Sequence, residues 1–269
     1  MEANSQIASS TRNADRIDTG ARFKPTDAVR LNNMFRGRDA NEMLHSVFED
    51  SLAGDVALVS SFGAESAILL HLVSQINKDV PVLFLDTGKH FPETLEYRDL
   101  LVERLGLNII NLKPEIADVS KKDENGLRWS FDPDGCCHIR KVLPLEKELA
   151  KYDASISGRK GFQSETRNAL PRFEIDTSDA HGRLKINPLA AWSKEQLDAY
   201  IVEHDLPPHP LVEQGYPSIG CSPCTSKVAE GEDPRSGRWS GWDKVECGIH
   251  APVSAIPQAD DDGSNDPIF

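Results

Sequence analysis

The stretches that decide the fold are Asp55-Val-Ala-Leu-Val-Ser-Ser61 and Val80-Pro-Val-Leu-Phe-Leu-Asp86. Both runs are apolar throughout rather than alternating in polarity, which is typical of strands covered on both faces of a sheet. Between them, Phe62-Gly63 breaks the first run, and residues 64–76 carry apolar side chains at helical spacing. The pattern therefore predicts a strand, a helix and a second strand.

The same rhythm continues downstream. Pro92 opens a helix that Gly106 ends, and Leu107 to Leu112 is a third strand. Strands alternating with helices predict an α/β fold, with an open, mostly parallel, doubly wound sheet. Further expected elements are a strand over 154–157, short strands over 172–176 and 184–187, and a helix from a capping box at Ser193 to about residue 204.

Length and charge limit the classes of protein that this chain can be. Its 269 residues suit a single large domain, and its net charge of −13 argues against a nucleic-acid partner. No apolar run could cross a bilayer and residues 1–19 lack a secretory signal, so we expect a cytoplasmic protein without a membrane partner. We expect a disordered lead-in over 1–22, the folded domain over 23–250 and an acidic disordered tail over 251–269.

Three segments that suit an anion follow predicted strands, and they should meet where the carboxyl ends of the strands lie. Ser60 to Ser66 offers hydroxyls, a glycine and the amides of a helix N-terminus. Asp86-Thr-Gly88 ends the second strand, and Gly158-Arg-Lys-Gly161 with Arg167 adds positive charge. Each segment alone also fits an ordinary turn, but together they favour a nucleotide. The first is not a Walker A loop, since no Gly-Lys-Ser/Thr follows.

Four of the five cysteines form two close pairs, Cys136-Cys137 and Cys221-Ser-Pro-Cys224. Four thiolates match either a zinc site or an iron–sulfur cluster. A Cys-x-Pro-Cys redox motif would need the helix start of a thioredoxin-like unit, whereas this pair lies in a Pro- and Gly-rich loop. Four unrelated buried thiols are the other alternative. A metal site is favoured, and the spacing of the cysteines does not decide between zinc and an iron–sulfur cluster.

The fifth cysteine, Cys247, stands apart, between Lys244 and His250. Positive neighbours can lower the pKa of a thiol from about 8.5 and so produce the nucleophilic thiolate. Its position just before the acidic tail suggests a mobile C-terminal segment that closes over a site and reopens. An unreactive thiol near a terminus is the simpler alternative. We predict that Cys247 is the catalytic nucleophile.

Five motifs, each modest alone, follow one another along the chain. They are Ser-Phe-Gly-Ala-Glu at 61–65, Leu-Asp-Thr-Gly at 85–88, Cys-Cys-His-Ile-Arg-Lys at 136–141, Arg-Ser-Gly-Arg-Trp at 235–239 and Glu-Cys-Gly-Ile-His at 246–250. Together they make the chain resemble the sulfonucleotide reductases of sulfate assimilation over roughly residues 30–250. The resemblance implies an adenine nucleotide α-hydrolase-like fold.

In that family the cysteine of Glu-Cys-Gly attacks the sulfur of the sulfonucleotide, and Cys247 holds this position. The resemblance implies AMP and an enzyme S-sulfocysteine, from which thioredoxin or glutaredoxin releases sulfite. Members with both cysteine pairs carry a [4Fe–4S] cluster and mostly use adenylyl sulfate. The resemblance therefore implies an adenylyl-sulfate reductase with one cluster per subunit. The alternative is a reductase of phosphoadenylyl sulfate or of both substrates. Homo-oligomers occur in the family. The implied cluster ligands are Cys136, Cys137, Cys221 and Cys224.

The resemblance also implies contacts with the substrate. Lys141 resembles the lysine that links cluster and substrate electrostatically, and Arg167, Arg235 and Arg238 match arginines of the phosphosulfate site. Two departures are Ser66, where relatives often have an acidic residue, and Arg159-Lys160, where Gln-Arg-Arg is commoner after the glycine. The segment between residues 239 and 247 is also short. The positions that match the nucleotide site are Ser61, Phe62, Gly63, Leu85, Gly158 and Arg159.

Two other classes of function compete with the reductase. An ATP pyrophosphatase-like enzyme of the same architecture needs a Ser-Gly-Gly-x-Asp-Ser loop, and Ser60-Ser-Phe-Gly63 lacks the paired glycines and the aspartate. A zinc-stapled, non-enzymatic interaction module would use the four cysteines alone. The chain shows no thioredoxin-like domain of the plant type, so we expect its reductant to be a separate protein.

Overall fold

The computed structural model describes residues 22–163, 167, 169–179, 181–244 and 246–250, which fold around a six-stranded sheet. The strand order is β3-β2-β1-β4-β6-β5, and all neighbouring strands are parallel except β5, which runs antiparallel to β6. This confirms the predicted open, mostly parallel sheet. The strands are β1 (Val56–Ser60), β2 (Pro81–Leu85), β3 (Asn108–Leu112), β4 (Ala154–Ser157), β5 (Phe173–Ile175) and β6 (Leu184–Ile186).

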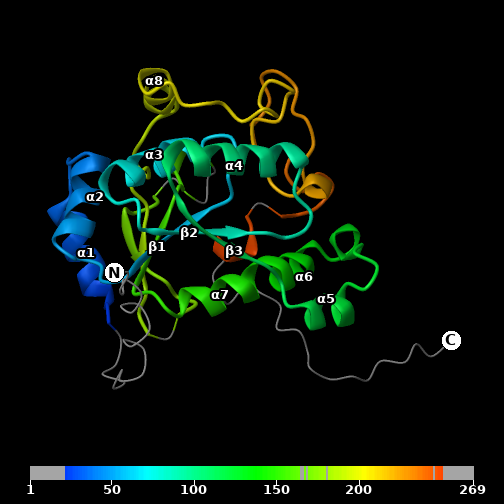
Figure 1. The fold of residues 1–269 in the computed structure, drawn as a ribbon, viewed down its shortest axis with the longest axis horizontal. Coiled ribbons are helices and arrows are strands. Elements are labelled where there is room, and N and C mark those ends of the chain that lie inside the picture. The colour runs from blue at the N-terminus through cyan, green and yellow to red at the C-terminus, as the bar shows by residue number, and fades with distance from the viewer. Residues whose placement is uncertain (1–21, 164–166, 168, 180, 245, 251–269) are drawn as a thin grey trace, which may run out of the picture.

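Helices cover both faces of this sheet (Figure 1). In the described part of the chain, α2, α4 and α8 each pack against α3 on one face, while α7 packs on β2 and β3 from the other. The helices are α1 (Pro25–Met34), α2 (Ala40–Glu49), α3 (Ser66–Ile76), α4 (Pro92–Leu105), α5 (Ile116–Lys122), α6 (Pro133–Cys137), α7 (Leu143–Leu149) and α8 (Lys194–Glu203).

Local sequence signals set several helix ends as predicted. α4 begins at Pro92, and Gly106 caps its C-terminus in the left-handed conformation at φ 65°. Ser193 and Gln196 form the expected reciprocal capping box of α8. The helices α1 and α2, which the sequence patterns did not predict, precede β1, and Asp39 caps α2 by accepting a hydrogen bond from the Glu42 amide at 2.7 Å.

A π-helical segment, His138–Val142, joins α6 directly to α7. Pro144 follows at the start of α7. Proline has no N–H for the helical ladder, and its ring clashes with the carbonyl oxygen four residues earlier, here that of Arg140. The wider turn accommodates this clash without ending the helix. It carries Arg140 and Lys141, three and four residues after Cys137.

Among the described residues, no helix is both long enough and apolar enough to cross a membrane. The predicted lead-in, apart from residue 22, and the predicted acidic tail lie outside the described residues.

Candidate active site

The loop between β1 and α3 forms one wall of a cavity at the carboxyl edge of the sheet. The amide of Phe62 donates to Ser60 Oγ at 3.2 Å, and Ser66 Oγ donates to the Gly63 carbonyl at 2.7 Å. Phe62 adopts the left-handed conformation at φ 49°, which is rare for a bulky residue. The turn is held tightly enough to present backbone groups to a ligand.

The cavity has a volume of about 660 Å³, which is the size of a small-molecule site. It brings together segments more than 180 residues apart in the sequence, including the 217–221 loop and the segment 246–249. Phe62, predicted to hold the nucleotide, does not line it, because its ring is fully buried against Phe84. The other predicted substrate residues all line it: Ser61, Gly63, Leu85, Lys141, Gly158, Arg159, Arg167, Arg235 and Arg238, together with Cys247.

Positive charge converges on this cavity. Burial and the neighbouring Arg167 lower the pKa of Arg159 to about 10, and burial also lowers the pKa of Arg235. Within the described residues, the buried Nε atoms of Arg159 and Arg238 have no hydrogen-bond partner. Crowded, desolvated cations with unused donors are what an anion-binding site requires.

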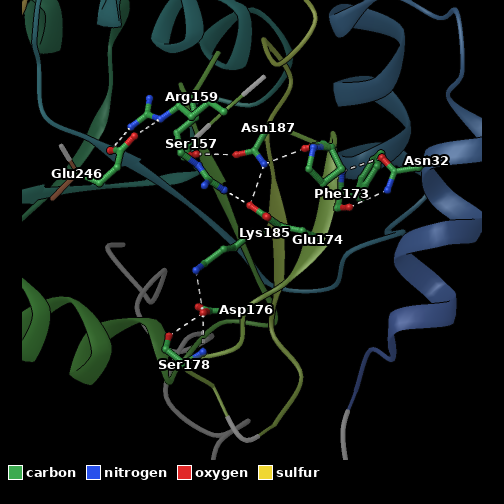
Figure 2. A network of polar contacts seen from close by, with 12 residues as sticks. Asn32, Ser157, Arg159, Phe173, Glu174, Asp176, Ser178, Lys185, Asn187 and Glu246 are labelled. Carbon is green, nitrogen blue, oxygen red and sulfur yellow. Dashed lines mark hydrogen bonds and ion pairs between the residues drawn. The ribbon is translucent and has the colours of Figure 1, made fainter. Parts of the chain in front are cut away.

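Several of these cations are held by carboxylates that the sequence analysis did not identify. Arg159 pairs with Glu174, and Figure 2 shows Glu174 also reaching the side chain of Asn187. Lys160, only 4% exposed, donates to Glu65 at 2.9 Å. These pairs leave Arg159 anchored at the wall of the cavity rather than free in solvent.

A second, much smaller cavity adjoins the first and contains the two cysteine pairs. Cys136, Cys137, Cys221 and Cys224 all line it. Residues 221–224 form a tight turn in which the Cys224 amide donates to the Cys221 carbonyl at 3.0 Å. Thr87, two residues after the end of β2, places its Oγ1 3.4 Å from Cys221 Sγ. The structure therefore brings together four thiols that are separated by up to 88 residues in the sequence.

The cysteine side chains of this cavity are buried or half-buried thiols. In the described part of the chain, no three or more His, Cys, Asp or Glu side chains are placed to hold a single ion. Burial raises the pKa of Cys136 to about 11 and also raises the pKa of Cys224. Buried thiols of this kind become thiolates readily only when a cation or metal compensates their charge.

Lys141 lies between the two cavities and lines both. Burial alone would lower its pKa, but electrostatic interaction with the sulfur groups of Cys221, Cys247 and Cys137 outweighs burial and raises the pKa of Lys141 above its usual range. A buried ammonium at this place joins the cysteine site to the larger cavity electrostatically.

Cys247 lies in the larger cavity, and its Sγ accepts a hydrogen bond from Cys137. This hydrogen bond lowers the pKa of Cys247 well below the usual value; burial opposes it, and Lys141, the Ile249 amide and Arg238 add to the lowering. The predicted neighbour Lys244 instead donates to Asp134, and the side chain of His250 lies outside the described part. The positive charge facing Cys247 therefore comes mainly from a distant segment, α6 to α7.

Comparison with known proteins identifies the family of this fold and site. Residues 55–227 match the phosphoadenosine phosphosulfate reductase domain. The chain belongs to this family. A Mesorhizobium japonicum protein named adenosine 5′-phosphosulfate reductase is 49% identical over 214 residues, 79% of this chain and 80% of the relative. A Chelativorans protein of the same name is 50% identical over 200 residues, 74% of this chain and 80% of the relative.

A solved structure of the family has the same fold. The crystal structure of phosphoadenylyl-sulfate reductase from Candida auris, a phosphate complex, matches with a TM-score of 0.65 and 26% identity. The match covers 78% of this chain and 100% of that chain. The predicted resemblance to sulfonucleotide reductases is therefore confirmed.

Proposed function

We propose that this chain reduces adenylyl sulfate to sulfite and AMP in sulfate assimilation, with Cys247 as the nucleophile. The observation that supports this most is that Cys247, Lys141 and the arginines line one cavity. Relatives named adenosine 5′-phosphosulfate reductase are 49% and 50% identical, whereas the phosphoadenylyl-sulfate reductase structure is 26% identical. This difference favours adenylyl sulfate over its 3′-phosphorylated form.

The first step is nucleophilic attack. The Cys247 thiolate attacks the sulfur of adenylyl sulfate, a sulfur–sulfur bond forms, and the bond from sulfur to the bridging oxygen breaks. The electron pair of that bond leaves on the phosphate of AMP. Lys141, Arg235 and Arg238 line the cavity and supply positive charge for the leaving phosphate. The enzyme is left as S-sulfocysteine.

The second step is thiol exchange with a separate dithiol protein, thioredoxin or glutaredoxin. Its thiolate attacks the Cys247 sulfur, expels sulfite and forms a mixed disulfide. Its second thiol resolves this disulfide, which returns Cys247 as a thiol and leaves the partner oxidised. This chemistry suits the reducing cytoplasm, where we propose that the protein works.

We further propose that the four remaining cysteines hold one [4Fe–4S] cluster. They fit such a group because all four thiols line one small cavity, which Lys141 also lines. A zinc ion needs its thiolates within about 4 Å of one another, since Zn–S bonds are short, whereas a cluster takes one thiolate on each of four irons. When bound, the cluster would supply a fixed charge beside Lys141.

Sulfite release tests the function. With adenylyl sulfate and thioredoxin, the protein should produce sulfite and AMP in equal amounts, and Cys247→Ser should abolish both. The control is the iron content and visible absorbance of this variant, which should match the parent because Cys247 is not a proposed cluster ligand. Retained turnover in Cys247→Ser would refute the assignment.

Two further measurements separate the alternatives. Anaerobically purified protein should be brown with about four irons per chain, whereas a zinc-stapled module would be colourless. Comparing kcat/KM for adenylyl sulfate and its 3′-phosphorylated form would identify a reductase of either or both substrates. Equal values for the two would contradict a preference for adenylyl sulfate.

A further inference from the structure

Glu246, the residue before the proposed nucleophile, is bound to an arginine of the substrate cavity. Arg167 donates from Nε to Glu246 Oε1 at 2.7 Å and from Nη2 to Oε2 at 2.6 Å. Arg235 Nη2 lies 3.7 Å from Oε2. The two nitrogens of Arg167 thus bind both oxygens of the carboxylate, in the way that they could bind two oxygens of a phosphate or sulfate.

The remaining side of Arg167 is held by a polar chain. Its Nη1 donates to Gln163 Oε1 at 2.9 Å, and Gln163 Nε2 donates to Glu65 Oε2 at 3.1 Å. All three nitrogens of the Arg167 guanidinium therefore have partners. A ligand anion that uses the Nε and Nη2 atoms must take them from Glu246.

The pair is also shielded from water. The side chains of Arg167 and Glu246 are 8% and 15% exposed, so the carboxylate compensates an arginine that would otherwise be buried and uncompensated. Figure 2 shows Glu246 beside a polar network in which Glu174 contacts Asn187 and Phe173 contacts Asn32. Since Arg167 is also held by Gln163, exchange of the anion requires Glu246 to move.

The segment that carries Glu246 makes further contacts on both sides of it. Lys244 donates to Asp134 before it, and Ile249 packs after it against the apolar cluster that includes Leu85 and Leu145. Asp134 does not line the substrate cavity, whereas Leu85 and Ile249 do. Among these contacts, the one through Glu246 is made to arginines that a substrate anion would need.

We propose that Glu246 is a built-in anion that occupies the phosphosulfate-binding arginines of the empty enzyme and gives way when substrate or AMP binds. This rests on the proposed function, because it takes Arg167 and Arg235 as the phosphosulfate arginines. By linkage, the competition is reciprocal: the carboxylate weakens the binding of AMP, and AMP loosens the segment that carries Cys247. Glu246 is thus a positioning residue that couples occupancy of the cavity to exposure of the nucleophile.

Binding of AMP to the holoenzyme tests the competition. Glu246→Gln keeps the shape of the side chain and removes its charge, so we expect it to bind AMP roughly five- to tenfold more tightly than the parent by calorimetry. Glu246→Asp keeps the charge and should stay close to the parent. Asp243→Asn removes an exposed carboxylate from the same segment and should change nothing. Unchanged or weaker binding in Glu246→Gln would overturn the inference.

Modification of Cys247 by iodoacetamide, located by peptide mass spectrometry, tests the coupling. In the parent, AMP should accelerate the modification, and Glu246→Gln should react at the faster rate without AMP. If Glu246→Gln loses its cluster, the test uses the parent protein alone. Modification of Cys247 in the parent that is slower with AMP, or equally fast, refutes the proposal. A parent that neither binds AMP nor releases sulfite would contradict the proposed function, whereas normal AMP binding without any effect of Glu246 would contradict this inference alone.

Discussion

Arg140 donates from Nε and Nη2 to one carboxylate oxygen of Asp123, at 3.0 and 2.8 Å. A third nitrogen, Nη1, donates to the carbonyl of Thr87 at 2.8 Å, and the hydroxyl of Thr87 contacts Cys221. Arg140 thus connects the π-helical segment that follows the first cysteine pair to Thr87, which contacts the second cysteine pair. The ion pair of Arg140 and Asp123 is buried. Its side chains are 10% and 1% exposed.

Removing Arg140 should therefore destabilise the protein strongly. Arg140→Met leaves the Asp123 carboxylate buried without its partner, and we expect a loss of about 3–5 kcal/mol in the free energy of unfolding, measured with urea. The matched control is Lys147→Met, which breaks the solvent-exposed pair of Lys147 and Glu115 and should leave the free energy of unfolding nearly unchanged. Equal losses in the two variants would contradict the structural role of the pair.

Lys141 should matter for binding of the nucleotide as well as for the cysteine site. Lys141→Met removes the buried positive charge that lines both cavities, so AMP should bind at least about tenfold more weakly, a loss of about 1.4 kcal/mol. Lys113→Met, an exposed lysine near Asp86, is the control and should bind AMP like the parent. Normal affinity in Lys141→Met would show that its charge does not reach the ligand.

His209 should stay neutral well into the acid range. It is completely buried, its Nδ1 accepts from the Leu211 amide at 3.2 Å, and its Nε2 therefore donates to Thr94 Oγ1 at 3.2 Å. Burial lowers the pKa of His209 to about 4. The unfolded chain then binds the proton more strongly, so this contribution to stability is complete above pH 6.5 and falls by roughly 3 kcal/mol between pH 6.5 and 4.

Nuclear magnetic resonance of the His209 ring checks this directly, since its signals should remain those of the neutral form at pH 5.5. The pH dependence of unfolding should also be shallower in His209→Gln, which cannot titrate at this position. Titration of the ring near pH 6.5 would contradict the prediction.

Gly237 should be required for the loop that holds the second cysteine pair. A Cβ at Gly237 would overlap the backbone carbonyl oxygen of Ser226. The two residues lie this close because the Ser226 amide donates to the Gly237 carbonyl at 2.8 Å. Gly237→Ala should therefore separate Thr225 from Arg238 and reduce the iron retained per chain to less than half that of the parent. Ser236→Ala, an exposed neighbour, should retain iron normally.

The strands were predictable because their signals are local. Continuous apolar runs predicted β1, β2 and β3 to within a residue or two, and the predicted span 154–157 coincides with β4. The sheet order was not predictable from such runs, since it depends on which strands meet in space. The reversal of β5 against β6 agrees with the short connection between them, residues 176–183, because a parallel pair needs a longer crossover.

The candidate site divides in the same way. The cysteines and most cavity residues were predicted because motifs carry them, but Glu246 and Glu65 were not, because each pairs with a cation 79 or 95 residues away. For Cys247 the neighbours in sequence, Lys244 and His250, suggested the source of positive charge. The structure turns Lys244 toward Asp134 and brings Lys141 to the sulfur instead.

The wide turn at residues 138–142 makes the number of residues in this part of the chain a constraint of its own, beside the buried charges of Arg140 and Lys141. Each residue of an α-helix rotates the chain by about 100°. Removing one residue between Cys137 and Leu145 would therefore turn the cysteine pair out of register with the leucines that pack on the sheet. No side-chain substitution could restore that register, so a deletion here would separate the cysteine pair from its packing on the sheet even if every remaining side chain were kept.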